Sequence, residues 1–133
     1  MVVAAGMIFK DSRVLICKRP MSKKLEAGKW EFPGGKQEEG ETLWAALRRE
    51  LQEELDITIT EGGIYDAQVK LYEDGTQVFI TFYSVTAFEG EPKALEHSEI
   101  KFVDVKELSS YELADADRRA ADKLISDREE TDA

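Results

Sequence analysis

Residues 35–57, GKQEEGETLWAALRRELQEELDI, are the stretch that decides the fold of this chain. They predict a loop that runs into a helix over residues 42–55, with Thr42 as the N-cap. Leucines recur every four residues along one stripe of that helix, and three glutamates fall beside the stripe: Glu50, Glu53 and Glu54. Because like charges near the edge of a core repel one another, we expect a divalent metal ion to compensate these carboxylates. The alternative is a helix face whose glutamates are only solvated.

The rest of the chain is predicted to form strands and one further helix. Patterns rich in β-branched and aromatic residues predict strands at residues 2–9, 13–19, 30–32, 57–60, 64–72, 77–88 and 100–105. Gly62-Gly63 is expected to interrupt the strand pattern, and Pro33-Gly34-Gly35 to form a tight turn. A C-terminal helix is predicted over residues 114–126. This order of elements favours an α/β fold with a mixed sheet between helices.

Composition restricts the class of protein and its partners. The 133 residues suit one domain, over residues 1–126, followed by a charged tail at 127–133 that we expect to fray. A net charge of −10 argues against binding to a nucleic acid polymer or an anionic membrane, although metal ions can bridge acidic side chains to a small phosphorylated ligand. A single cysteine, Cys17, and a single histidine, His97, exclude an intrachain disulfide and a Cys/His zinc site. With no apolar run of about 20 residues and no basic leader, a cytoplasmic location is expected.

The acidic helix and the loop before it resemble the Nudix box. The match rests on residues at a fixed spacing: Gly35, Glu41, Arg49-Glu50-Leu51, Glu53-Glu54 and Ile57. Asp56 stands where the family pattern has glycine, and aspartate is one of the residues that tolerate the left-handed conformation at the end of a helix. Similarity outside the box, at residues 30–36, 89–92 and 113–117, resembles the MutT-type nucleoside triphosphate pyrophosphatases and the related CTP pyrophosphohydrolases.

This resemblance implies a Nudix α/β/α sandwich and a magnesium-dependent reaction, with Mn²⁺ able to substitute. In that reaction water attacks a phosphorus atom of a nucleoside triphosphate, and the products are the monophosphate and pyrophosphate. The resemblance also implies a set of metal ligands: the carbonyl of Gly35 and the carboxylates of Glu50, Glu53, Glu54 and Glu96. Arg49, expected to orient a glutamate, joins the four glutamates in the catalytic set. Glu99 competes with Glu96 for its role, and Glu41 is expected to support the junction of loop and helix.

Five residues are expected to bind the substrate: Arg19, Phe32, Lys36, Tyr83 and Asp117. The resemblance implies phosphate contacts for the two cations and a base pocket lined by the two aromatic residues. Asp117 lies where the resembled enzymes place a side chain that reads the base. An ionised aspartate only accepts hydrogen bonds, which suits the amino group of cytosine, whereas a protonated one also donates. His97 is expected to be a bystander, because the resembled chemistry relies on carboxylates.

Several alternatives stay open at this point. The substrate is a cytidine-type (d)NTP, an oxidised purine nucleotide such as 8-oxo-dGTP, or else a nucleoside diphosphate sugar or another diphosphate ester. A module that senses nucleotides without hydrolysing them is disfavoured, because every acidic position of the box is intact. The sequence leaves both a monomer and a homodimer open, with a small-molecule nucleotide as the expected partner.

Overall fold

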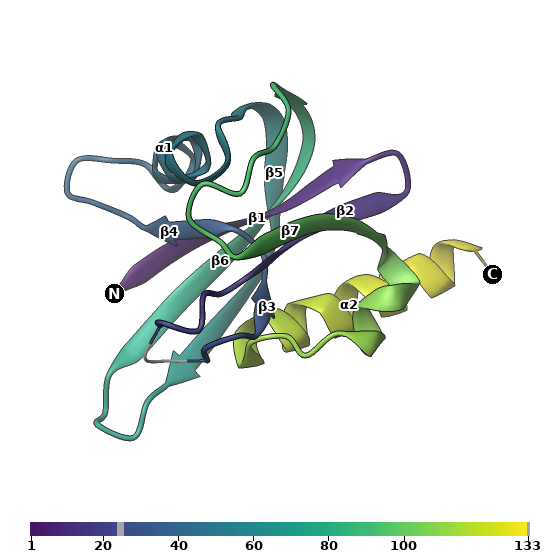
Figure 1. The fold of residues 1–133 in the computed structure, drawn as a ribbon. Coiled ribbons are helices and arrows are strands. Elements are labelled where there is room, and N and C mark those ends of the chain that lie inside the picture. The colour runs from purple at the N-terminus through teal and green to yellow at the C-terminus, as the bar shows by residue number, and fades with distance from the viewer. Residues whose placement is uncertain (24–25, 133) are drawn as a thin grey trace.

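Figure 1 shows a computed structural model of the protein, which describes residues 1–23 and 26–132. The elements follow one another in this order: β1 (Val2–Lys10), β2 (Arg13–Lys18), β3 (Trp30–Glu31), β4 (Gly34–Lys36), α1 (Leu43–Leu55), β5 (Thr58–Leu71), β6 (Gln77–Glu89), β7 (Glu99–Asp104), the 3₁₀ helix η1 (Val105–Ser110) and α2 (Asp115–Asp132). In the described residues neither helix combines the length and the apolar character that crossing a membrane requires.

The strands form a mixed sheet, as the sequence predicts. The main path runs β3-β2-β1-β6-β5, with β4 paired to β1 and β7 paired to β2. The pairing of β1 with β6 is parallel, whereas the hairpin of β1 with β2 and the long ladder of β5 with β6 are antiparallel. A central strand with parallel and antiparallel partners is buried on both faces, which explains the nearly continuous apolar run at residues 2–9.

The two helices cover opposite faces of the sheet (Figure 1). Successive side chains of a strand point to opposite faces, so β1 contributes to two separate cores. Ala4 and Ile8 pack with the leucines of α1, while Ala5 and Met7 pack with the alanines of α2. The predicted α/β/α sandwich is confirmed.

The ends of α1 lie where the sequence places them. The hydroxyl of Thr42 accepts a hydrogen bond from the Ala45 amide at 3.1 Å, which caps the first turn. Asp56 has a φ of 58° and donates its amide to the Gln52 carbonyl, so it ends the helix in the left-handed conformation. The substitution of aspartate for the family glycine therefore preserves the helix end.

Two predictions about glycines are wrong. Gly34-Gly35 belongs to the short strand β4, not to a tight turn, and a Cβ on Gly34 would lie 2.0 Å from the Ala4 carbonyl oxygen. This glycine therefore allows two strands to approach closely. Gly62-Gly63 does not interrupt the chain either, because β5 continues through it with register shifts against β6. A Cβ on Gly62 would lie 2.5 Å from the Ser84 carbonyl oxygen, so close strand contact again explains the glycine.

The predicted end of the C-terminal helix at Ser126 is also wrong. The helix α2 continues through Asp132, so residues 127–132 are helical and not a frayed tail. Asp127 accepts hydrogen bonds from the Tyr65 hydroxyl and, at 2.9 Å, from the Lys123 ammonium group. These contacts join the last turns to β5. The final residue of the predicted tail, and Lys24 and Leu25 of the predicted loop 20–29, lie outside the described residues.

Candidate active site

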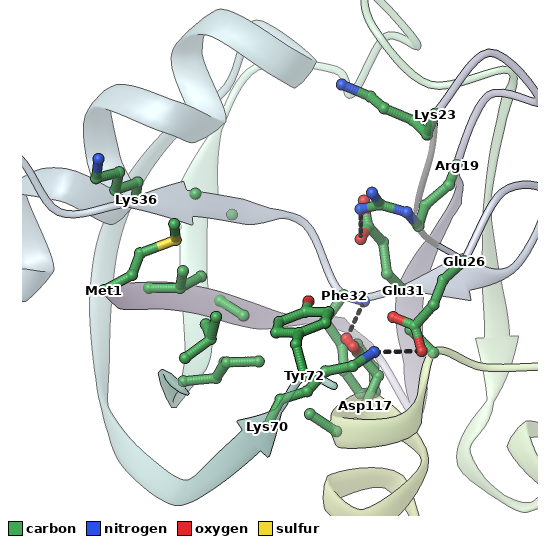
Figure 2. Close-up of a pocket in the computed structure, with 18 of the residues that line it drawn as sticks. Met1, Arg19, Lys23, Glu26, Glu31, Phe32, Lys36, Lys70, Tyr72 and Asp117 are labelled. Carbon is green, nitrogen blue, oxygen red and sulfur yellow. Dashed lines mark hydrogen bonds and ion pairs between the residues drawn. The ribbon is translucent and has the colours of Figure 1, made fainter. Parts of the chain in front are cut away.

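A cavity of about 940 Å³ opens on the α2 face of the sheet and reaches round to the end of α1 (Figure 2). Its floor includes Ala5 and Ile80, which also contact the core beneath α2. Seven residues that the sequence predicts for the site line this cavity: Arg19, Phe32, Gly35, Lys36, Glu54, Glu96 and Asp117. The fold thus brings together residues that are nearly 100 positions apart in the chain.

Tyr83 does not lie in this cavity. It packs on the α1 face, where its ring centroid is 5.4 Å from that of Trp44 and where both residues border a smaller hollow. The expectation that Tyr83 lines the base pocket is wrong for a simple reason. Tyr83 follows Phe82 on β6, so the two side chains point to opposite faces of the sheet.

The three glutamates of α1 differ strongly in exposure. The side chain of Glu53 is 55% exposed and that of Glu50 is 18% exposed, whereas Glu54 as a residue is only 8% exposed. The carbonyl of Glu54 accepts a hydrogen bond from the Leu95 amide at 3.2 Å, which brings the segment containing Glu96 to the end of α1. Glu96 lines the cavity, while Glu99 begins β7 and lies 3.9 Å from the Lys101 ammonium group.

Arg49 holds the loop before α1 against the helix. Its Nε and Nη2 donate to the two carboxylate oxygens of Glu41 at 2.8 and 3.0 Å, and Nη1 donates to Glu50 at 2.8 Å. Nη2 also donates to the Lys36 carbonyl at 3.0 Å. Bidentate contact with Arg49 lowers the pKa of Glu41 to about 2. The charge-assisted bond expected between Arg49 and a glutamate is present, and Glu41 contacts the helix through Arg49 at the junction of loop and helix.

Glu54 is the buried acid of this corner. Burial, followed by the charges of Glu50, Glu31 and Glu96, raises the pKa of Glu54 to about 9, and a hydrogen bond from the Gly34 amide opposes this only in part. Its Oε2 atom is buried and has no hydrogen-bond partner. A group of this kind favours either a proton or a cation beside it.

The residues at this corner fit a hard divalent cation. They offer oxygen ligands only, which suits Mg²⁺ or a similar ion, and one oxygen of Glu54 has no other partner. A Cβ on Gly35 would lie 2.3 Å from the carboxyl carbon of Glu50, so glycine lets the β4 backbone reach that carboxylate. Within residues 1–23 and 26–132, no three acidic, histidine or cysteine side chains are already gathered closely enough to hold an ion. The carboxylates surround one corner without converging on a point, as mutually repelling groups do.

The opposite end of the cavity contains a buried acid. Asp117, at the start of α2, accepts a hydrogen bond from the Phe32 amide at 2.8 Å (Figure 2). Burial, opposed by this bond and reinforced by nearby Glu31 and Glu26, raises the pKa of Asp117 to about 8. At neutral pH the carboxyl is therefore mostly protonated and can donate as well as accept. The preference for cytosine inferred from the sequence requires an ionised Asp117, so a protonated Asp117 does not support it.

Sequence reasoning missed several residues that line the cavity: Glu26, Glu31, Lys70, Tyr72 and His97. The Lys70 ammonium group lies 2.5 Å from Glu26 and 5.3 Å from the centroid of the Tyr72 ring, next to the α2 end of the cavity (Figure 2). The alternation of charged and apolar residues along β5 gives Lys70 a defined face. It does not reveal that this face borders a cavity.

A mixed-sheet sandwich with an acidic helix beside a cavity lined by cations defines the class: an α/β protein with a carboxylate-rich ligand site. The NUDIX domain family model matches residues 1–125, and the chain belongs to this family. The resemblance seen in the box is confirmed.

Individual relatives agree with this assignment. The chain is 37% identical over 115 residues to the CTP pyrophosphohydrolase of Escherichia coli strain K12, covering 86% of this chain and 84% of that protein. It is 40% identical over 90 residues to the 8-oxo-dGTP diphosphatase of Proteus vulgaris, covering 67% of this chain and 79% of that protein. The crystal structure of a MutT NUDIX hydrolase from Burkholderia pseudomallei superposes with a TM-score of 0.83 at 30% identity, covering 91% of this chain and 95% of that one.

Proposed function

We propose that this chain is a Nudix pyrophosphohydrolase that converts nucleoside triphosphates to the monophosphate and pyrophosphate with Mg²⁺, for which Mn²⁺ can substitute. The observation that carries the proposal is the arrangement along one cavity. Carboxylates, with the buried Glu54 among them, lie at the α1 end, Arg19, Lys23 and Lys36 lie along the walls, and a buried acid lies at the α2 end. A nucleoside triphosphate fits this order along the cavity, with its metal-bound phosphates at the α1 end and its base at the α2 end.

The metal would be held by the carbonyl of Gly35 and by the carboxylates of Glu50, Glu53, Glu54 and Glu96. When bound, a divalent ion withdraws charge from phosphate oxygens and makes a bound water more acidic. The protein itself contributes the orientation of these ligands. Arg49 fixes Glu50, and burial keeps Glu54 dependent on a cation or a proton.

Arg19 and Lys36 are proposed to contact the phosphates, and Phe32 and Asp117 to contact the base. A protonated Asp117 offers one donor and one acceptor, so it can pair with cytosine or with an oxidised purine. This agrees with relatives whose names cite CTP in one case and 8-oxo-dGTP in the other. We therefore propose activity on more than one (d)NTP.

A substrate panel tests the reaction. Purified protein is incubated with CTP, dCTP, dGTP, 8-oxo-dGTP, a nucleoside diphosphate sugar and ADP-ribose, with Mg²⁺ and with EDTA, and the products are separated by anion exchange. The proposal expects monophosphate and pyrophosphate from the triphosphates, in the presence of Mg²⁺ only. Preferential cleavage of the sugar nucleotide would favour diphosphate esters as the substrate class. If none of the compounds is cleaved, the proposal that the protein is a hydrolase is wrong.

The substitution Glu54→Gln separates catalysis from folding. The amide has the shape of the carboxyl but cannot become a charged ligand, so hydrolysis should fall by about 100-fold or more. Stability without metal should stay equal or rise at neutral pH, because the variant removes a buried carboxyl whose raised pKa makes it take up a proton on folding. Glu107→Gln, an exposed change on η1, is the matched control and should behave as wild type in both assays. Full activity of Glu54→Gln would refute the proposed role.

A further inference from the structure

The carboxylate of Glu31 connects two parts of the site that come from distant segments. One of its oxygens accepts a hydrogen bond from Arg19 Nη1 at 2.8 Å, and the other lies 2.9 Å from His97 Nε2. Figure 2 shows the first of these contacts at one wall of the cavity. All three residues line that cavity, and the His97 side chain is only 4% exposed. Its Nε2 makes this contact, while its other ring nitrogen, Nδ1, is buried without a hydrogen-bond partner.

The first contact fixes a cation on the cavity wall. Arg19 follows β2, and its backbone is held by hydrogen bonds between its amide and the Lys29 carbonyl and between its carbonyl and the Gly28 amide. The guanidinium group then meets a carboxylate that is itself part of β3, where Glu31 pairs with Cys17. A charge-assisted bond to a rigid strand fixes the plane of the guanidinium group, which sets the direction in which it meets a phosphate.

The second contact fixes the segment that contains Glu96. A backbone hydrogen bond holds this segment on each side: the Leu95 amide donates to the Glu54 carbonyl at 3.2 Å, and the Ser98 amide donates to the Lys18 carbonyl at 3.1 Å. Between these two backbone hydrogen bonds, Nε2 of the His97 side chain contacts the Glu31 carboxylate. Because a carboxylate accepts but does not donate, His97 Nε2 donates this hydrogen bond when Glu31 is ionised. The position of Glu96 therefore depends on a side-chain contact made by the residue next to it.

The choice of a carboxylate at position 31 also has a cost. Its charge is one of those that raise the pKa of the buried Glu54. A neutral residue would remove this repulsion and still pair its backbone in β3. The charge of Glu31 thus adds to the repulsion around Glu54, while its carboxylate makes the two hydrogen bonds described above.

We propose that Glu31 is a positioning residue that aligns Arg19 with the substrate phosphates and, through His97, aligns Glu96 with the metal. This role of Glu31 rests on the proposed function and deepens it, because one residue then positions both a phosphate-binding cation, Arg19, and a metal ligand, Glu96. His97 is then part of this device and not a bystander.

The two contacts are tested by separate measurements. Binding of Mn²⁺ to the protein without nucleotide is followed by the loss of the free Mn²⁺ EPR signal, and KM and kcat for the preferred triphosphate are measured at saturating metal. Each lost charge-assisted bond is expected to change the affected constant by about tenfold. Arg19→Met should raise KM and leave Mn²⁺ affinity unchanged. His97→Leu should weaken Mn²⁺ binding and leave KM nearly unchanged. His97→Gln can donate a hydrogen bond from a similar position, so its Mn²⁺ affinity should stay close to that of the wild type.

The decisive variants are at Glu31 itself. Glu31→Ala should raise KM and weaken Mn²⁺ binding together, and adding Arg19→Met to it should raise KM no further. Glu31→Leu removes both acceptor oxygens with a side chain of similar size, and it serves if Glu31→Ala does not fold. Asp122→Asn removes another ion pair, with Arg118 on α2, and should leave both constants unchanged. A change in only one constant, or in neither, overturns the proposal.

These results are distinguishable from failure of the proposed function. If Glu54→Gln abolishes Mn²⁺ binding and hydrolysis but the Glu31 variants leave KM and Mn²⁺ affinity intact, the function stands and only the positioning role is wrong. If Glu54→Gln changes neither property, the metal site itself is wrong, and the role of Glu31 falls with it.

Discussion

Replacing Asp117 by asparagine should remove a pH-dependent penalty from the folded protein. Asp117 is buried at the start of α2, and its carboxyl accepts a hydrogen bond from the Phe32 amide at 2.8 Å. An asparagine side chain has nearly the same shape, and its carbonyl oxygen can accept the same bond. The substitution therefore changes the ionisation of this position while it leaves the packing nearly intact.

The magnitude follows from the two pKa values of this carboxyl. Burial raises the pKa of Asp117 to about 8 in the folded protein, against an ordinary value of 3.8. Between these values the unfolded chain releases the proton while the folded chain retains it. The contribution of this group to stability is thus fully present below the unfolded pKa and is lost as pH rises through the folded one. Each pH unit in this window removes about 1.4 kcal/mol, so the wild-type protein should lose roughly 3 to 4 kcal/mol from this group between pH 5 and pH 8.

Urea denaturation of both proteins at pH 5, 6, 7 and 8 measures this effect. The difference in unfolding free energy between Asp117→Asn and wild type cancels the other titrating groups, which the two chains share. That difference should shift in favour of the variant by roughly 3 to 4 kcal/mol across the series. Parallel pH curves, with a change below about 1 kcal/mol, would show that Asp117 is ionised in the folded protein. The sequence-based argument for cytosine would then regain its basis.

Two further predictions concern packing. Leu51→Ala should lower the free energy of unfolding by about 2 to 5 kcal/mol in urea denaturation, because Leu51 is fully buried between α1 and the sheet, and a fall below about 1 kcal/mol would contradict this packing. Gly34→Ala should lower the melting temperature in a thermal scan, because its Cβ would lie 2.0 Å from the Ala4 carbonyl oxygen. Gly63→Ala is its control, since nothing lies within 4 Å of a Cβ there, and equal shifts for the two variants would refute the explanation.

The sequence predicts α1 well because the signals for a helix are local. Thr42 caps the first turn through a contact only three residues away, and Asp56 ends the helix through its own backbone conformation. Neither feature depends on the rest of the chain. The apolar run of β1 is also readable in the sequence, because a strand buried on both faces is apolar almost continuously.

Predictions fail where a partner strand decides the outcome. Gly34 and Gly62 resemble breakers in the sequence, but each allows close approach to another strand. Tyr83 lies on the face opposite the cavity, because periodicity tells which side chains share a face but not which face carries the cavity. The end of α2 depends on contacts of Asp127 with Tyr65, far away in β5.

The sequence by itself determined the family, the mixed α/β fold and the helix that carries the glutamates, because these depend on fixed spacing and on local preferences. Only the tertiary structure decided how the acids differ. Burial sets Glu54 apart from the exposed Glu53 and keeps Asp117 protonated near neutral pH. The tertiary structure also brings Glu31 into contact with His97, a residue 66 positions away in the chain. The physical reason is that solvation and long-range contact are properties of the folded chain, whereas spacing is a property of the sequence.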